Sequence, residues 1–146
     1  MLWGISCSNE SFEESISLKN HTWVWTDTLK AEPILEDTSS YFHSWIEVSL
    51  DEKYPYSNFF LKEVIISPGD TPHFRILEFP VSNPDGSWLS KKHSGNTYHF
   101  KWQVLNLFKI NKPGKWKMYY IQYCRKDTLD GISNFTWKLQ ATSTPK

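Results

Sequence analysis

The second half of the chain alternates between apolar and polar residues with a period of two, which is typical of half-buried β-strands. Residues 98–110, 115–125 and 133–140 all carry this alternation. The side chains expected to face a core are those of Tyr98, Phe100, Trp102, Val104, Phe108, Ile110, Trp116, Met118, Tyr120, Cys124, Phe135, Trp137 and Leu139. Residues 111–114 read NKPG, in which Pro and Gly suit a tight reversal. We therefore expect 98–110 and 115–125 to form an antiparallel hairpin.

Further upstream, four segments have the composition of strands and are bounded by turn residues. They are residues 21–27, 43–50, 58–66 and 73–81. Residues 28–42 show no clear period, and residues 88–97 are expected to form a long loop. Strands of this length and spacing, with no window that holds a helical face, predict an all-β, two-sheet antiparallel β-sandwich of about 7–8 strands. The strand path is expected to be Greek-key or jelly-roll-like.

Length, charge and composition limit the number of domains and exclude some classes of function. The chain has 146 residues, so we expect a single β-sandwich domain over residues 21–141 and a short tail at 142–146. Lys and Arg together number 16, as do Asp and Glu, so the net charge is zero. Binding of nucleic acid through phosphates normally needs a basic excess, so we exclude nucleic acid as a partner. No stretch approaches the ~20 apolar residues that a membrane-spanning helix requires.

The N-terminal sequence MLWGISC is a short apolar stretch that ends in small residues and a cysteine. It resembles the end of a lipoprotein signal, although a complete signal has ~7–15 apolar residues before its cleavage site. We expect residues 1–6 to be a signal remnant, Cys7 to carry the lipid, and residues 7–20 to form a tether. The alternative is a disulfide between Cys7 and Cys124 in an oxidising compartment. We favour two unpaired cysteines, because a lone Cys124 within a strand packs as a small hydrophobe.

Motifs for catalysis or metal binding are missing from the sequence. It has neither a GxSxG nucleophile elbow nor a glycine-rich phosphate loop. The histidines lack the paired spacings of metal ligands; they are His21, His43, His73, His93 and His99. Asp127 and Asp130 can be read as a carboxylate pair, but with Gly131 they are more typical of a turn. We therefore predict no catalytic residue, no metal and no cofactor.

Aromatic residues make up 16% of the chain, which allows a second interpretation. Flat rings exposed on a sheet can stack on sugars, and the candidates are Trp23, Trp25, Trp45 and Trp88. Aromatic residues also dominate the energetics of cores and favour strands, so we expect most rings to be buried. Trp45 is an exception, because it alternates with Ile46 and Val48 and falls on the opposite side of its strand.

Six segments, in order along the chain, carry a resemblance to a known family. They are Trp23 followed by Asp27-Thr28-Leu29, then Tyr54-Pro55-Tyr56-Ser57-Asn58, Asp85-Gly86-Ser87-Trp88-Leu89, Pro113-Gly114-Lys115-Trp116, Gln122-Tyr123-Cys124-Arg125 and Leu129-Asp130-Gly131-Ile132. In this order and spacing they resemble the gliding-motility lipoprotein H (GldH) family of Bacteroidetes, from about residue 20 to 140. The family more often has Met at the position of Cys124.

The resemblance implies a non-enzymatic lipoprotein of the cell envelope, anchored to a membrane through lipid on Cys7. Its partners would be other envelope proteins of the gliding and type IX secretion apparatus. The candidate contact residues are Trp45, Tyr54, Tyr56 and Trp88, which fall in loops or on the expected outer face. The alternative function is a secreted carbohydrate-binding β-sandwich, which predicts a row of coplanar exposed rings.

Overall fold

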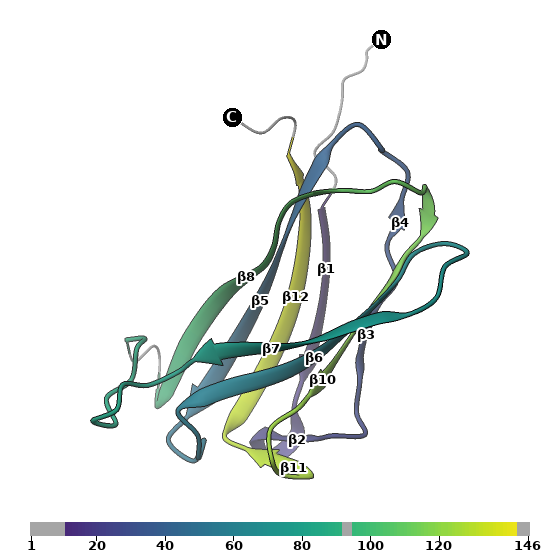
Figure 1. Ribbon diagram of the computed structural model, residues 1–146. Coiled ribbons are helices and arrows are strands. Elements are labelled where there is room, and N and C mark those ends of the chain that lie inside the picture. Colours follow the sequence, from purple (N-terminus) through teal and green to yellow (C-terminus); the bar gives the residue numbers. More distant parts are fainter. Residues whose placement is uncertain (1–10, 92–94, 143–146) are drawn as a thin grey trace.

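Two four-stranded antiparallel sheets pack face to face in the computed structural model, which describes residues 11–91 and 95–142 (Figure 1). The first sheet has the order β1 (Ser11–Ser17), β12 (Ile132–Thr142), β5 (Tyr41–Asp51) and β8 (Thr97–Lys109). The second has the order β3 (Leu29–Ala31), β10 (Lys117–Gln122), β6 (Asn58–Ile66) and β7 (His73–Pro80). The predicted all-β, two-sheet sandwich is confirmed.

Short elements complete the fold and raise the strand count above the prediction. Two small pairs join β2 (Thr22–Val24) to β11 (Thr128–Asp130) and β4 (Ile34–Leu35) to β9 (Gly114–Lys115). A 3-10 turn, η1 (Lys19–His21), links β1 to β2. The described residues thus form 12 strands instead of about 7–8. The additional strands include several of two or three residues, which are too short to show a period.

The expected tether at residues 7–20 contains a strand of the sandwich. β1 lies within it and pairs along its whole length with β12, from Ser11 opposite Gln140 to Ser17 opposite Asn134. Only Phe12 and Ile16 of this strand pack against the core, because β1 is an edge strand that the second sheet covers incompletely. Its remaining Ser and Glu side chains hide the alternation in the sequence, so the segment resembled a polar linker.

The predicted hairpin of residues 98–110 and 115–125 is wrong. β8 belongs to the first sheet, where it pairs with β5, whereas β10 belongs to the second sheet and pairs with β6 and β3. The connecting residues cross from one sheet to the other, and their end, β9, pairs with β4. Both strands show the alternation because each has one face on the same core, which says nothing about their being neighbours.

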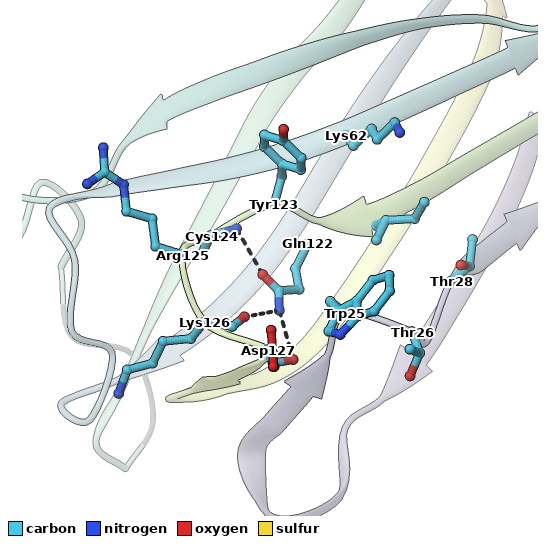
Figure 2. Close-up of a pocket in the computed structure, with 11 residues that line it drawn as sticks. Trp25, Thr26, Thr28, Lys62, Gln122, Tyr123, Cys124, Arg125, Lys126 and Asp127 are labelled. Carbon is cyan, nitrogen blue, oxygen red and sulfur yellow. Dashed lines mark hydrogen bonds between the residues drawn. The ribbon is translucent and has the colours of Figure 1, made fainter.

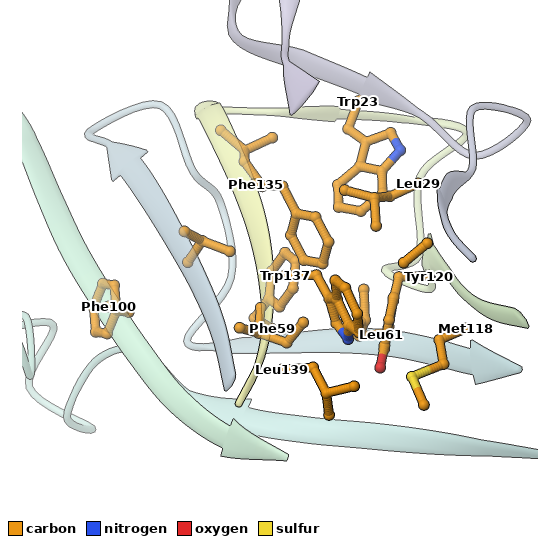
Figure 3. Packing of buried hydrophobic residues seen from close by; sticks show 14 of the residues in the cluster. Trp23, Leu29, Phe59, Leu61, Phe100, Met118, Tyr120, Phe135, Trp137 and Leu139 are labelled. Carbon is orange, nitrogen blue, oxygen red and sulfur yellow. The ribbon is translucent and has the colours of Figure 1, made fainter. Parts of the chain in front are cut away.

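The core between the sheets combines nine aromatic rings with aliphatic side chains (Figure 3). Its largest fully buried side chains are Trp23, Trp137, Tyr120, Phe42, Phe59 and Phe135. The centroids of the Trp23 and Phe135 rings lie 4.8 Å apart. The small β2–β11 pair at one end of the sandwich therefore packs against β12 of the first sheet. Among the described residues nine rings are buried, Trp23 included, and seven more are partly buried against the core. Most described rings therefore belong to the core or pack on it, although fewer than half are fully covered.

One charged side chain lies in this core. Glu63 on β6 is only 1% exposed. Its carboxylate accepts hydrogen bonds from Arg75 Nε on β7 at 2.6 Å and from the Tyr120 hydroxyl on β10 at 2.8 Å. Arg75 also donates to the Val104 carbonyl oxygen on β8 at 3.1 Å, which ties the two sheets together. Burial and the nearby Glu63 raise the pKa of Tyr120, so its hydroxyl keeps the proton that it donates.

We expect Arg75→Ala to lower the free energy of unfolding by about 2 kcal/mol, measured by urea denaturation. Removing one partner of a fully buried pair costs roughly 3–5 kcal/mol because the other charge stays unpaired, and the loss is smaller here because Arg75 is half exposed. In a double-mutant cycle, Glu63→Gln should lower the free energy of unfolding much less in the Arg75→Ala background than in the wild type. Additive losses would contradict the coupling.

Gly131 is the second constraint on the fold. It has φ +82, and a Cβ added there would lie 2.2 Å from the backbone nitrogen of Tyr54. Its own N–H donates to the His21 carbonyl at 2.9 Å, and its carbonyl accepts from Asp51 N at 2.8 Å. Only a residue without a side chain fits where these segments meet.

We expect Gly131→Ala to destabilise the fold by roughly 3 kcal/mol, because strain from the positive φ and a backbone clash combine. Gly86→Ala is the matched control, since Gly86 has φ +92 with nothing within 4 Å of the added Cβ. The control should lose only about 1–2 kcal/mol in the same urea titration. Equal losses in the two variants would show that the close approach to Tyr54 has no energetic consequence.

Candidate functional site

A groove of about 480 Å³ opens where the second sheet loses its edge strand (Figure 2). β3 pairs with β10 only at Met118–Tyr120, so the next residues of β10 have no strand neighbour on that side among the described residues. The groove lies beside them. It is lined by Trp25, Thr26, Thr28, Lys62, Ile121, Gln122, Tyr123, Cys124, Arg125, Lys126 and Asp127.

Gln122 holds the loop that forms one wall of the groove. Its side chain is buried, and its Nε2 donates to the carbonyl oxygens of Lys126 at 2.9 Å and Trp23 at 3.2 Å. Its Oε1 accepts from the backbone N–H of Cys124 at 2.9 Å. These bonds satisfy backbone groups that the loop leaves without strand partners. One amide side chain thus ties the loop after β10 to β2.

The opposite wall is fixed by two hydrogen bonds of the β2–β3 connection. The indole Nε1 of Trp23 donates to the Asp27 carbonyl at 2.7 Å, which closes the turn. The backbone N–H of Trp25 donates to the Asp127 carbonyl at 2.8 Å, which joins this connection to the loop after β10. Both walls are therefore attached to the buried core, and the groove is a formed feature of the fold.

The groove presents aromatic rings and cations to solvent. Trp25 is 54% and Tyr123 is 55% exposed, high values for large rings. Lys62, Arg125 and Lys126 contribute cations, and none of them forms an ion pair within the described part of the chain. Figure 2 shows the Arg125 and Lys126 side chains extending from the loop after β10. The site combines apolar contact area with three cations and one acidic residue, Asp127.

Cys124 faces inward from this loop as a free thiol. Its Sγ lies 3.6 Å from the Phe60 carbonyl oxygen and 3.7 Å from the Tyr54 hydroxyl. Burial raises the pKa of the Cys124 thiol, and burial together with the neighbouring thiol raises that of the Tyr54 hydroxyl. A thiol with a raised pKa is a poor nucleophile and a poor metal ligand, because both roles require the thiolate.

Tyr54 lies in the loop between β5 and β6, as expected, but its side chain is buried. Tyr54 is 6% exposed, and its hydroxyl donates to the Asn58 carbonyl at 2.6 Å. Its ring packs against Phe59 and, edge to face, against Tyr56. The residue follows a turn, which in the sequence is typical of a surface position, but the approach of Gly131 to its backbone places it in the core.

None of the other candidate contact residues lines the groove. Tyr56 and Trp88 are half-buried and, with Tyr54, line a separate pocket of about 420 Å³. Tyr56 also lines a pocket of about 220 Å³ that shares Cys124 and Arg125 with the groove. Trp88 stacks on Tyr98 with 4.0 Å between ring centroids. The structure therefore brings Tyr54, Tyr56 and Trp88 together at one pocket. The fourth candidate, Trp45, lies elsewhere, on the outer face of the first sheet. Cys7 lies outside the described residues.

The sequence contains one signal for the groove that alternation alone does not reveal. Around the end of β10, apolar residues occupy the outward positions as well as the inward ones, at Tyr119, Ile121 and Tyr123. A strand that is apolar on both faces indicates a covered or interacting surface, and this criterion identifies Tyr123.

The acidic and histidine side chains form no metal-binding group of three or more within residues 11–91 and 95–142. Asp127 ends the bend after β10, where its carbonyl accepts from Trp25, and Asp130 lies in β11 opposite Thr22. Gly131 has the positive φ expected for it. These observations support a structural role for the Asp127–Gly131 segment.

The sequence matches the GldH lipoprotein family over residues 10–138. The chain belongs to this family. The matched region begins just before β1 and ends within β12, so it includes the groove and both sheets. No curated protein and no solved structure matches the chain. Among the described residues of this GldH-family protein, no helix has the length and apolar character needed to cross a membrane.

We expect Cys124 of the folded protein to react with iodoacetamide at pH 8 at least about tenfold more slowly than in 8 M urea. The raised pKa lowers the fraction of the thiol that is ionised, and partial burial limits access of the reagent to it. The measurement uses Cys7→Ser, so that a single cysteine reacts, and follows the mass increase with time. A rate in the native protein equal to that in urea would contradict the half-buried position and the raised pKa of the thiol.

Proposed function

We propose that this GldH-family protein is anchored in the cell envelope by lipid on Cys7 and supports the gliding and type IX secretion machinery through contacts with other envelope proteins. Family membership places it among gliding-associated lipoproteins, and this observation carries the proposal. The protein acts without catalysis. Its single described thiol is half-buried with a raised pKa, and the groove offers aromatic and cationic contacts instead of a nucleophile and base.

The place of Cys7 relative to β1 suits anchoring. Cys7 precedes Ser11, the first residue of β1, by four positions, so the two Cα atoms lie at most ~14 Å apart. A lipidated Cys7 therefore holds the sandwich close to the membrane surface. Two or more acyl chains are needed for stable attachment, as found in lipoproteins, since one chain binds only reversibly.

Sugar binding is the weaker alternative, because the rings considered for it are dispersed. Trp23 is fully buried, and Trp88 is covered on one face by Tyr98. Trp45 lies beside His43, with Lys101 Nζ 5.3 Å from its ring centroid. Only Trp25 of the four is largely exposed. A carbohydrate-binding face requires several free ring faces in one row.

We expect Cys7→Ser to move the protein from the membrane fraction to the soluble fraction of the native host, because the acyl chains have no other attachment point. Mass spectrometry of the N-terminal peptide should show the acyl groups in the wild type. Cys124→Ser is the matched control and should remain in the membrane fraction with its acyl groups unchanged.

The same strains report on function. Cells that carry only Cys7→Ser should glide and secrete less than cells with Cys124→Ser, at equal protein amounts on immunoblots. If Cys7→Ser stays at the membrane, the anchoring site is wrong. If the released protein supports normal gliding and secretion, the proposed role at the membrane is wrong.

A further inference from the structure

The outer faces of the two sheets differ in character. On the first sheet the outward side chains are mainly polar and interact with one another. Glu47 pairs with Lys138 at 2.7 Å and with His99 at 3.1 Å, and Ser15 bonds Thr136 at 2.8 Å. A polar outer face of this kind is what an antiparallel sheet presents to water.

The outer face of the second sheet is apolar with interspersed lysines. The register places Phe74, Val64 and Tyr119 side by side across β7, β6 and β10. The next row consists of Ile76, Lys62 and Ile121. Phe74 is 66% exposed and Ile76 42%, although an unpartnered sheet normally carries polar side chains at such positions.

This outer face and the groove form one continuous surface. Lys62 and Ile121 belong to both, since they lie in the second row of the sheet and line the groove. Tyr123 continues the face beyond β10, where its N–H bonds the Phe60 carbonyl of β6 at 2.9 Å. The exposed rings thus extend from Phe74 on one edge strand to Trp25 beyond the other.

The charge of this surface is unbalanced. Lys30, Lys62 and Lys117 lie on the sheet face, and Arg125 and Lys126 lie at the groove. The carboxylates on the same surface are fewer: Glu78, which accepts from Asn58, Glu32, which accepts from Tyr119 at 2.7 Å and lies 3.9 Å from Lys115, and Asp127 at the groove. Because the chain as a whole is neutral, this local excess of positive charge is complementary to an acidic ligand.

The position of the groove in the sandwich argues against the anchoring membrane as that ligand. β2 and β11, which adjoin the groove, lie at the end opposite Ser11 and Thr142 (Figure 1). β1 spans about 23 Å between the two ends. Anchoring at Cys7 tethers the Ser11 end within ~14 Å of the lipid, so the groove lies at the far end of the domain. This step depends on the proposed function.

We propose that the groove and the adjoining outer face of the second sheet bind an extended acidic segment of a protein partner. Trp25 and Tyr123 pack on its apolar side chains, and Lys62, Arg125 and Lys126 pair with its carboxylates. The open side of β10 beyond Tyr120 offers room for an extended chain in line with β3. Aromatic and arginine side chains in such a position are the usual centres of binding energy in protein interfaces.

The test is site-specific photo-crosslinking in the native host. p-Benzoylphenylalanine replaces Tyr123 in one strain and Gln103, an exposed residue of β8 in the first sheet, in the matched control. We expect a protein adduct from position 123 that maps by mass spectrometry to an Asp- and Glu-rich segment, with little adduct from position 103. A lipid adduct, equal adducts from the two positions, or no adduct from position 123 would overturn the proposal.

Charge reversal tests the ionic part of the contact. Arg125→Glu with Lys126→Glu should lower the adduct yield from position 123 by about fivefold or more, because like charges then face the acidic segment. Lys101→Glu with Lys109→Glu, on β8 of the first sheet, is the matched control and should leave the yield unchanged. Equal yields in both double variants would contradict an acidic partner.

Membrane fractionation separates this proposal from the proposed function. Both double variants should remain in the membrane fraction and should show wild-type thermal unfolding when purified. If Arg125→Glu with Lys126→Glu stays in the membrane fraction and loses the adduct, the change has affected the docking surface and not the anchor. Release of the wild-type protein from the membrane would instead refute anchoring.

Discussion

The buried carboxylate of Glu63 is the constraint on which the arrangement of the second sheet depends. It occupies an inward position of β6, where the alternation calls for an apolar side chain, and a charge there is tolerated only when it is paired. Arg75 and Tyr120 supply the two hydrogen bonds, so β7 and β10 must flank β6 in the observed register. Arg75 then reaches β8 and connects the second sheet to the first.

This register determines what the outer face of the second sheet presents. With Glu63 inward, its neighbours Lys62 and Val64 point outward, and the pairing places Phe74, Ile76 and the outward residues of β10 beside them. The same side chains lead into the groove that Gln122 and the β2–β3 connection hold open. An apolar, cationic surface at the end of the sandwich opposite the proposed anchor is the feature of this GldH-family domain best suited to a protein partner.

The sequence indicates some residues of this surface, but it does not indicate how exposed they are. Two-sided apolar character at the end of β10 indicates Tyr123, and Trp25 lies in an evident turn. The exposure of each ring depends on neighbours that are distant in the chain. Tyr54 also follows a turn, yet Gly131 and Phe59 enclose it, whereas nothing encloses Trp25 among the described residues. Turn chemistry locates a residue along the chain without revealing which other segments lie against it.

The sequence by itself determined the all-β class, most of the long strands and the side of each that faces the core, because alternation records whether successive side chains meet water or protein. Tertiary structure alone decided which strands are neighbours. Residues 98–110 and 115–125 carry matching patterns and a turn between them, yet β8 and β10 lie in opposite sheets. Strand pairing uses backbone groups that are the same at every residue, so its choice of partner depends on long-range packing around Glu63 and the aromatic core.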